Sequence, residues 1–213
     1  RSKMGRTRFI KTVEDTAARE RRRNRHRSRG FLGGAKPPEP GVSKGDVFPF
    51  GQGRGMKPRP RSNFTSPAQP APGQPTPWVW YAPTLPGLPG PEETWMFERF
   101  LEAGMGIAGI DVGESYGSPG GCSLFSALYG ELTERRGLSG KACLLARSRG
   151  GLMLYNWAVQ HPSSVACVAG IYPVCNLSSY PGVEKACGAY GMTEAEFAER
   201  LKEYNPIDRI ASL

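Results

Sequence analysis

The sequence predicts an α/β protein whose parallel sheet is covered by helices on both faces. Segments with helical periodicity separate several short runs of apolar residues, and strands that alternate with helices in this way form parallel sheets with right-handed crossovers. Continuous rather than alternating apolar runs are typical of strands buried on both faces. The predicted strands span residues 77–82, 106–112, 142–146 and 164–171.

The predicted helices follow these strands in order. The first spans 92–104 and has acidic residues in its first turn, and the second spans 124–136. The third, at 152–159, is apolar on almost every side and is therefore expected to be buried. Thr193 and Glu196 have the spacing of a capping box, which opens a last helix. The inner face of that helix is expected to hold Phe197, Leu201 and Tyr204.

The charge is divided unevenly along the 213 residues, whose formal net charge is +9. Residues 1–76 hold 18 of the 28 basic and 5 of the 19 acidic residues, a net of +13. Residues 77–213 hold the other 10 basic and 14 acidic residues, a net of −4. Because the segment 31–76 is rich in glycine and proline, it cannot bury enough apolar surface to fold. We therefore expect residues 1–76 to be a disordered basic segment and residues 77–213 to be the folded domain.

Composition excludes several classes of protein. No apolar run reaches the roughly 18 residues of a membrane helix, and no apolar core follows the N-terminal charges as in a secretory signal. The five cysteines include no CxxC pair, which argues against a disulfide framework or a zinc site. We expect free, mostly buried thiols in a reducing compartment, and hence a cytoplasmic protein. We also expect no membrane partner, metal or cofactor.

The segment 144–152 carries the most informative pattern, because it places a serine between a predicted buried strand and a predicted buried helix. Ala146 stands two residues before Ser148, and Gly150 stands two residues after it. A nucleophilic serine on a sharp strand-to-helix turn needs small neighbours, since bulkier ones would clash with the adjacent chain. The helix behind the turn directs N–H groups and the positive end of its dipole toward the serine. Ser148 is the candidate nucleophile, and the backbone N–H of Arg149 is a candidate oxyanion donor.

The order Ala-Arg-Ser-Arg-Gly at 146–150 resembles the G-x-S-x-G motif of the α/β-hydrolase family, with alanine in the first position. The loop 83–87 occupies the place of that family's oxyanion loop, although it lacks the His-Gly pair that begins this loop in many esterases. The segment 109–117 is similar to the strand and loop before the elbow in esterase-like and prolyl-oligopeptidase-like members. The resemblance covers about residues 77–213.

This resemblance implies a serine hydrolase that acts on the ester or amide bond of a small-molecule or peptide substrate. It also implies a second oxyanion donor, the backbone N–H of Thr84 or Leu85, because Pro86 has none. Arg147 and Arg149 flank the serine, where they could favour an anionic substrate or pair with nearby carboxylates.

A serine nucleophile also needs a base. His26 lies in the basic segment, and His161 lies 13 residues after Ser148 at the far end of the same helix, about 20 Å away by the helical rise. We expect His161 to be structural. In the family the acid and the histidine follow the serine along the chain, and both are expected beyond Leu213. Asp208 lies on a helix-like segment and is not assigned as the acid, so we expect an incomplete α/β-hydrolase fold, a C-terminally truncated fragment without catalytic competence.

Other functions remain open. The arginine-rich run at 19–29 could bind nucleic acid through phosphates, and only residues 1–30 offer this, but no aromatic residues stand between the arginines for base stacking. A non-catalytic α/β-hydrolase-like interaction protein is a further alternative, as is a plain Rossmann-like turn with an incidental serine. The glycine-rich loops match neither phosphate-binding motif. Asp111 and Glu114 precede the serine, and we expect them to cap loops.

Overall fold

A computed structural model describes residues 46–49, 61–67 and 73–212 of the chain. All of these residues belong to one unit, which comprises residues 42–213. The arginine-rich run at 19–29 lies outside the described residues, so nucleic-acid binding through residues 1–30 stays a prediction. The disorder expected of residues 1–45, 50–60 and 68–72 likewise lies outside them.

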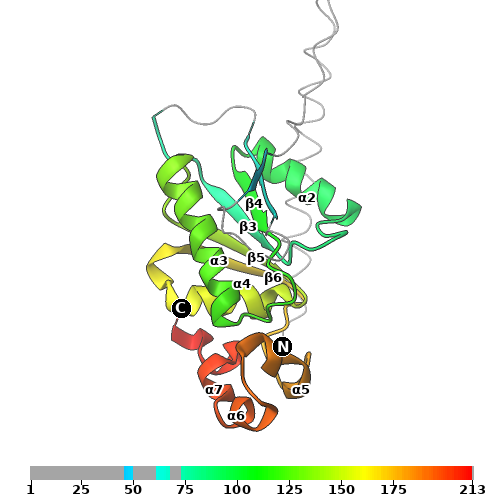
Figure 1. The fold of residues 1–213 in the computed structure, drawn as a ribbon. Helices are drawn as coiled ribbons and strands as arrows, with labels where there is room; N and C mark the ends of the chain where they lie inside the picture. Colours follow the sequence, from blue (N-terminus) through cyan, green and yellow to red (C-terminus); the bar gives the residue numbers. More distant parts are fainter. Residues whose placement is uncertain (1–45, 50–60, 68–72, 213) are drawn as a thin grey trace, which may run out of the picture. The chain divides into compact units, whose positions relative to one another are not determined.

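The unit is built on a six-stranded sheet with the strand order β1-β2-β4-β3-β5-β6 (Figure 1). Neighbours among β3 to β6 run parallel, whereas β2 is antiparallel to both β1 and β4. The predicted parallel strands are thus confirmed as β4, β3, β5 and β6, and the antiparallel strands β1 and β2 extend one edge and make the whole sheet mixed. The strands are β1 (Asp46–Pro49), β2 (Arg61–Thr65), β3 (Trp78–Ala82), β4 (Gly106–Ile110), β5 (Ala142–Arg147) and β6 (Val165–Ile171).

The prediction of helices on both faces is confirmed (Figure 1). Helix α2 covers one face, and α3 and α4 cover the other. The α-helices are α2 (Pro91–Glu102), α3 (Pro119–Gly130), α4 (Gly150–Gln160), α5 (Val183–Ala186), α6 (Glu194–Glu199) and α7 (Leu201–Tyr204). A π-helical turn, η1 (Glu131–Arg135), extends α3, and the 3₁₀ turns are η2 (Pro162–Ser164), η3 (Cys187–Tyr190), η4 (Pro206–Asp208) and η5 (Ile210–Ser212).

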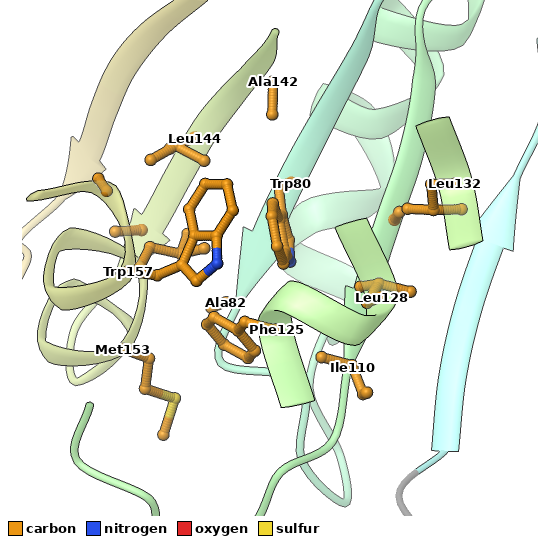
Figure 2. Close-up of a cluster of buried hydrophobic side chains, with 14 of the residues drawn as sticks. Trp80, Ala82, Ile110, Phe125, Leu128, Leu132, Ala142, Leu144, Met153 and Trp157 are labelled. Atoms are coloured by element: carbon orange, nitrogen blue, oxygen red, sulfur yellow. The ribbon is translucent and has the colours of Figure 1, made fainter. Parts of the chain in front are cut away.

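Aromatic side chains fill the core between the sheet and helices α3 and α4 (Figure 2). Trp80 of β3 contacts Phe125 of α3 and Trp157 of α4, with ring centroids 5.3 Å and 4.7 Å away. All three side chains are at most 1% exposed. Because large aromatic rings bury much apolar surface, this contact fixes α3 and α4 against the centre of the sheet.

Helix α2 packs on the opposite face of the sheet. The β3 side chains that it contacts alternate along the strand with those of the aromatic core. Val79 and Tyr81 point to this face, as the period of two along a strand requires. Met96, Phe97 and Phe100 of α2 pack against them. The helix begins after Gly90, whose N–H donates to a carboxylate oxygen of Glu93 at 2.8 Å, and Pro91 takes its first position.

Two strands lie in the segment that was predicted to be disordered. The residues of β2 pair with β4, Phe64 lying opposite Ala108, and β1 pairs with β2. Ser62 is buried and Phe64 is half-buried, its ring against Gly106. The prediction of disorder is therefore wrong for residues 46–49 and 61–65, because a polar strand gains its order from pairing with a distant one.

The C-terminal helices follow the predicted capping box. Thr193 N–H donates to the Glu196 carboxylate at 2.8 Å, and Glu196 N–H donates to the Thr193 hydroxyl at 3.3 Å. The predicted single helix is interrupted at Arg200, so that α6 and α7 are separate. Phe197 still lies fully buried, and Tyr204 packs near it.

Strand β6 is less covered than its apolar sequence predicts. It pairs only with β5 among the described strands, and its five central residues are exposed.

The cysteines are also less buried than predicted: all five are free, but only Cys122 is buried, and Cys167 of β6 is exposed. The prediction of mostly buried thiols is therefore wrong. Within the part of the chain that is described, no helix has the length and apolarity needed to cross a membrane.

Replacing Phe125 by alanine is expected to lower the free energy of unfolding by about 3–5 kcal/mol, because the cavity would open within the aromatic core. Trp95→Ala is the matched control, since its ring is 70% exposed on α2. That change is expected to stay within about 0.5 kcal/mol of wild type. Urea denaturation followed by circular dichroism measures both, and equal losses would contradict this assignment of the core.

Candidate functional site

Ser148 lies in the sharp turn between β5 and α4, at the edge of the sheet where the parallel strands end. Its φ of +49° falls in the left-handed region, which non-glycine residues rarely adopt. Its N–H donates to the carbonyl of Ile171 at 3.0 Å, and its own carbonyl accepts from Val174 at 2.7 Å and Gly151 at 3.0 Å. Hydrogen bonds on both sides of the residue thus hold the strained conformation in place.

The small neighbours predicted around the serine are required by space. A Cβ atom built on Gly150 would overlap the carbonyl oxygen of Ala82 in β3, and one built on Gly151 would overlap the carbonyl oxygen of Val174. Ala146 is fully buried in β5. Helix α4 therefore begins in direct contact with the end of β3, which is the geometry predicted for the turn.

The candidate oxyanion donors are not equally available. Among the described residues, the backbone N–H groups of Arg149 and Thr84 have no hydrogen-bond acceptor. The N–H of Leu85 donates to the carbonyl of Leu88 at 3.2 Å, in a tight turn that also pairs these residues in the opposite direction. The N–H of Leu85 is thus already used within its loop, so Thr84 is the better candidate for the second oxyanion donor. Thr84 is buried, and with Tyr81 it lines a cavity of about 120 Å³.

Both arginines beside Ser148 are paired with carboxylates. Arg147 forms an ion pair with Glu93 of α2, and Arg149 forms one with Glu114 at 3.2 Å. Of the two alternatives for these arginines, an anionic substrate or pairing with nearby carboxylates, the structure shows the pairing. The two pairs differ in environment: the Glu93 side chain is 4% exposed, whereas that of Glu114 is 41% exposed.

Glu93 accepts three hydrogen bonds in a buried position. The Tyr81 hydroxyl donates to its Oε1 at 2.9 Å, a guanidinium N–H of Arg147 donates to the same oxygen, and the Gly90 N–H donates to Oε2 at 2.8 Å. Burial raises the pKa of Glu93, but the bonds from Gly90 and Tyr81 and the charge of Arg147 outweigh it and lower that pKa below its ordinary value. Glu93 is therefore ionised at neutral pH.

The same network also determines the protonation of Tyr81 and Arg147. Burial, with the hydrogen bond to Glu93, raises the pKa of Tyr81, so its hydroxyl stays protonated and donates. The hydrogen bond from Arg147 to the hydroxyl of Tyr172, with the contributions of Tyr81 and Glu93, raises the pKa of Arg147. The network thus contains one cation and one anion and carries no net charge.

The sequence pattern predicts for Glu93 only a place in the acidic first turn of a helix and misses its ion pair with Arg147. A signal for that role exists in the helical spacing. Glu93 lies three, four and seven residues before Met96, Phe97 and Phe100, the residues with which α2 packs on the sheet. A carboxylate on an apolar face needs a cationic partner. Arg147 faces it from the end of β5.

The loop after β4 places its acidic residues differently. Asp111 accepts a hydrogen bond from the N–H of Gly113 at 2.9 Å, which confirms its predicted role as a loop cap. Glu114 instead pairs with Arg149, whose guanidinium also donates to the hydroxyl of Tyr180 at 3.4 Å. This pair lies at the surface beside the candidate nucleophile.

His161 lies far from Ser148, as predicted. His161 follows the last turn of α4, at the opposite end of this helix from the candidate nucleophile. Its Nε2 lies 3.3 Å from the hydroxyl of Ser126, and its ring packs on Trp157 with centroids 4.7 Å apart. His26 lies outside the described residues. Asp208 lies on η4 rather than after a strand, as expected.

Gly150→Ala is expected to destabilise the fold by about 3 kcal/mol, because the added methyl group meets the backbone of β3 rather than a movable side chain. Gly120→Ala serves as the control, since a Cβ atom there meets nothing closer than 4.0 Å. Its unfolding free energy should change by less than about 1 kcal/mol. Denaturant midpoints of both variants test this, and a Gly150 variant as stable as wild type would contradict the close contact.

Glu93→Gln is expected to remove part of the acid sensitivity of the fold. Because the pKa of Glu93 is lower in the folded state, its contribution to stability is fully present above its ordinary pKa of about 4.5 and is lost as the pH falls through the lower folded value. The variant should therefore be less stable than wild type at pH 7, with a difference that shrinks below pH 4.5. Urea denaturation at several pH values measures this, and a difference that grows on acidification would refute it.

Comparisons with known proteins relate this geometry to solved structures. No protein-family model matches the sequence, and no curated protein matches it. An S-formylglutathione hydrolase from Agrobacterium tumefaciens has a similar structure, with a TM-score of 0.61 and 17% identity over 78% of this chain and 71% of that one. A putative carboxylesterase from Lactobacillus plantarum has a TM-score of 0.52 and 17% identity, over 76% and 72% of the two chains.

Peptidases are similar over a smaller part of their length. Dipeptidyl peptidase 4 from Porphyromonas gingivalis has a TM-score of 0.59 and 13% identity, and the match covers 81% of this chain but 26% of that one. These neighbours share the α/β-hydrolase fold. The order of the parallel strands and the turn between β5 and α4 agree with that similarity. The chain therefore has the α/β-hydrolase fold.

Proposed function

We propose that this protein is a serine hydrolase that cleaves an ester or amide bond through Ser148. The observation that carries the proposal is the strained backbone of Ser148, with φ at +49°, at the point where a buried strand meets a buried helix. Strained non-glycine residues cluster at functional sites, where the surrounding structure offsets their cost. A serine held in this way presents its hydroxyl at the end of the sheet.

The proposed reaction uses two backbone donors. The Ser148 hydroxyl oxygen attacks the substrate carbonyl carbon as its proton passes to solvent water, and the C=O electron pair becomes an oxyanion. The N–H groups of Arg149 and Thr84 would stabilise that oxyanion. Its collapse expels the alcohol or amine, which takes up a proton, and leaves an acyl-serine that water hydrolyses. The first turn of α4 supports the Arg149 donor, because its dipole places partial positive charge there.

A base for this reaction is not supplied by the described histidine. His161 is held by Ser126 and Trp157 at the other end of α4. No histidine among the described residues lies beside Ser148, and serine hydrolases without their histidine lose most of their rate, so we expect Ser148 to react slowly.

The named neighbours support a hydrolase without separating its substrates. The matches to the S-formylglutathione hydrolase and the putative carboxylesterase cover about seven-tenths of those chains, which favours an ester. The similar peptidases keep an amide or peptide substrate in the proposal. A non-catalytic protein with the same fold is the alternative that the test below must separate.

A fluorophosphonate probe is expected to label Ser148 slowly and specifically. Prolonged incubation followed by peptide mass spectrometry should find the adduct on this residue, at a rate about 10³-fold or more below that of a complete triad enzyme. Ser148→Ala should abolish the adduct, whereas Ser178→Ala, a change at an exposed serine, should leave it unchanged.

Two outcomes would overturn parts of this proposal. Absence of an adduct on Ser148 in the folded chain would reject the nucleophile and favour the non-catalytic alternative. Labelling as fast as that of complete serine hydrolases would keep the nucleophile but contradict the expected slow reaction.

A further inference from the structure

Backbone strain in this chain is gathered at one edge of the sheet. Among the described non-glycine residues, positive φ occurs at Tyr116, Ser148 and Tyr172, with values of +47°, +49° and +39°. They follow the ends of β4, β5 and β6. Tyr172 differs from the other two because its side chain is 67% exposed. A large aromatic ring on strained backbone at the surface has no evident packing role in this fold.

The ring of Tyr172 belongs to a short segment that lies beside the nucleophile. Ser148 N–H donates to the carbonyl of Ile171, and Val174 N–H donates to the carbonyl of Ser148. These two bonds, at 3.0 Å and 2.7 Å, fix the residues on either side of Tyr172 and Pro173 to the nucleophile turn. Tyr172 therefore follows directly on a residue that touches Ser148.

A chain of hydrogen bonds holds this ring from the other side of the sheet. Arg147 Nε donates to the Tyr172 hydroxyl at 2.9 Å, and the same guanidinium pairs with Glu93. Glu93 is itself fixed by Tyr81 and by the N–H of Gly90. A buried carboxylate on α2 thus determines the direction of the arginine, and the arginine holds the exposed ring of Tyr172, which follows the residue bonded to Ser148.

We propose that Tyr172 forms an aromatic wall of the substrate site beside Ser148, that Glu93 and Arg147 are positioning residues for its ring, and that this site takes substrates carrying an uncharged planar group there. The role as a wall of the substrate site rests on the proposed function of Ser148. The binding of a planar group to Tyr172 and its positioning by Arg147 do not.

The chemistry of the wall selects the ligand class. An aromatic ring favours an offset or edge-to-face contact with another planar group over a contact with a saturated one. Arg147 is neutralised by Glu93, and Arg149 by Glu114, so neither arginine leaves an uncompensated positive charge to attract a carboxylate. The site is thus expected to prefer a neutral aryl group to an anionic one.

The test places a fluorine reporter on the proposed wall. 3-Fluorotyrosine is incorporated at position 172 of the full chain, and its ¹⁹F resonance is followed during titration with acetanilide, a neutral aryl amide. A saturable shift is expected, with an affinity about fivefold higher than that for N-cyclohexylacetamide, which has similar size but no planar ring. 4-Acetamidobenzoate, the anionic analogue, should bind no more tightly than acetanilide.

Three results would each contradict the proposed role of Tyr172: no shift with acetanilide, equal affinity for the cyclohexyl compound, or tighter binding of the anionic analogue. The titration does not depend on nucleophilic reactivity, because it measures binding without bond cleavage. A shift at position 172 combined with an unlabelled Ser148 would therefore reject the proposed hydrolase and keep the binding site.

The positioning role is tested in the same labelled chain. Glu93→Gln and Arg147→Met are expected to move the ¹⁹F shift toward that of free 3-fluorotyrosine and to reduce the preference for acetanilide. Glu114→Gln is the matched control, since it removes the carboxylate of the other ion pair and should change neither reading. An unchanged resonance and preference in the folded Arg147→Met variant would refute the positioning role.

One further probe covers the case in which the Glu93 or Arg147 variants do not fold. Incorporating 3-fluorophenylalanine instead of 3-fluorotyrosine at position 172 removes the hydroxyl that Arg147 holds, without touching the buried ion pair. The ring should then show the shift of the free amino acid and a weaker preference for acetanilide. Retention of the full preference without this hydroxyl would also refute positioning by Arg147.

Discussion

The contact between Gly150 and the carbonyl oxygen of Ala82 is the constraint on which the site depends. It brings the first turn of α4 against the end of β3, so little space remains for the chain between β5 and α4. Ser148 crosses that space with φ at +49°. The cost of such a conformation is about 1–3 kcal/mol, and the buried helix behind it, anchored through Trp157 and Trp80, offsets that cost.

Stability alone gives little reason for the ion pair of Glu93 and Arg147. Removing two charges from water costs about as much as their attraction returns, so a pair of apolar residues would serve the fold equally well. The pair has a directional consequence that apolar residues could not have. It turns a guanidinium next to Ser148 toward α2 and leaves its Nε to hold Tyr172. We therefore interpret the pair by what it positions.

The sequence predicts those features that depend on local patterns. Apolar runs predicted β3 to β6, the spacing of Thr193 and Glu196 predicted the start of α6, and the small residues around Ser148 predicted the turn. Strand β2 has no such pattern, because its order comes from pairing with β4. The use of the Leu85 N–H by Leu88 depends on the conformation of one loop, and composition does not specify it.

The site is best understood as the junction of four strand ends with one helix from each face. β5 supplies Arg147 and leads into Ser148, β3 sets the space available to the turn, and β6 ends in the segment that bonds Ser148 on both sides. Helix α2 enters only through Glu93, yet this residue connects its face of the sheet to Tyr172 at the surface. The loop after β4 approaches from the other side through Glu114 and Arg149. The two arginines on either side of Ser148 in the chain thus pair with different carboxylates, and each positive charge is neutralised. In the reaction that we propose, the oxyanion is therefore stabilised by backbone N–H groups rather than by side-chain charge.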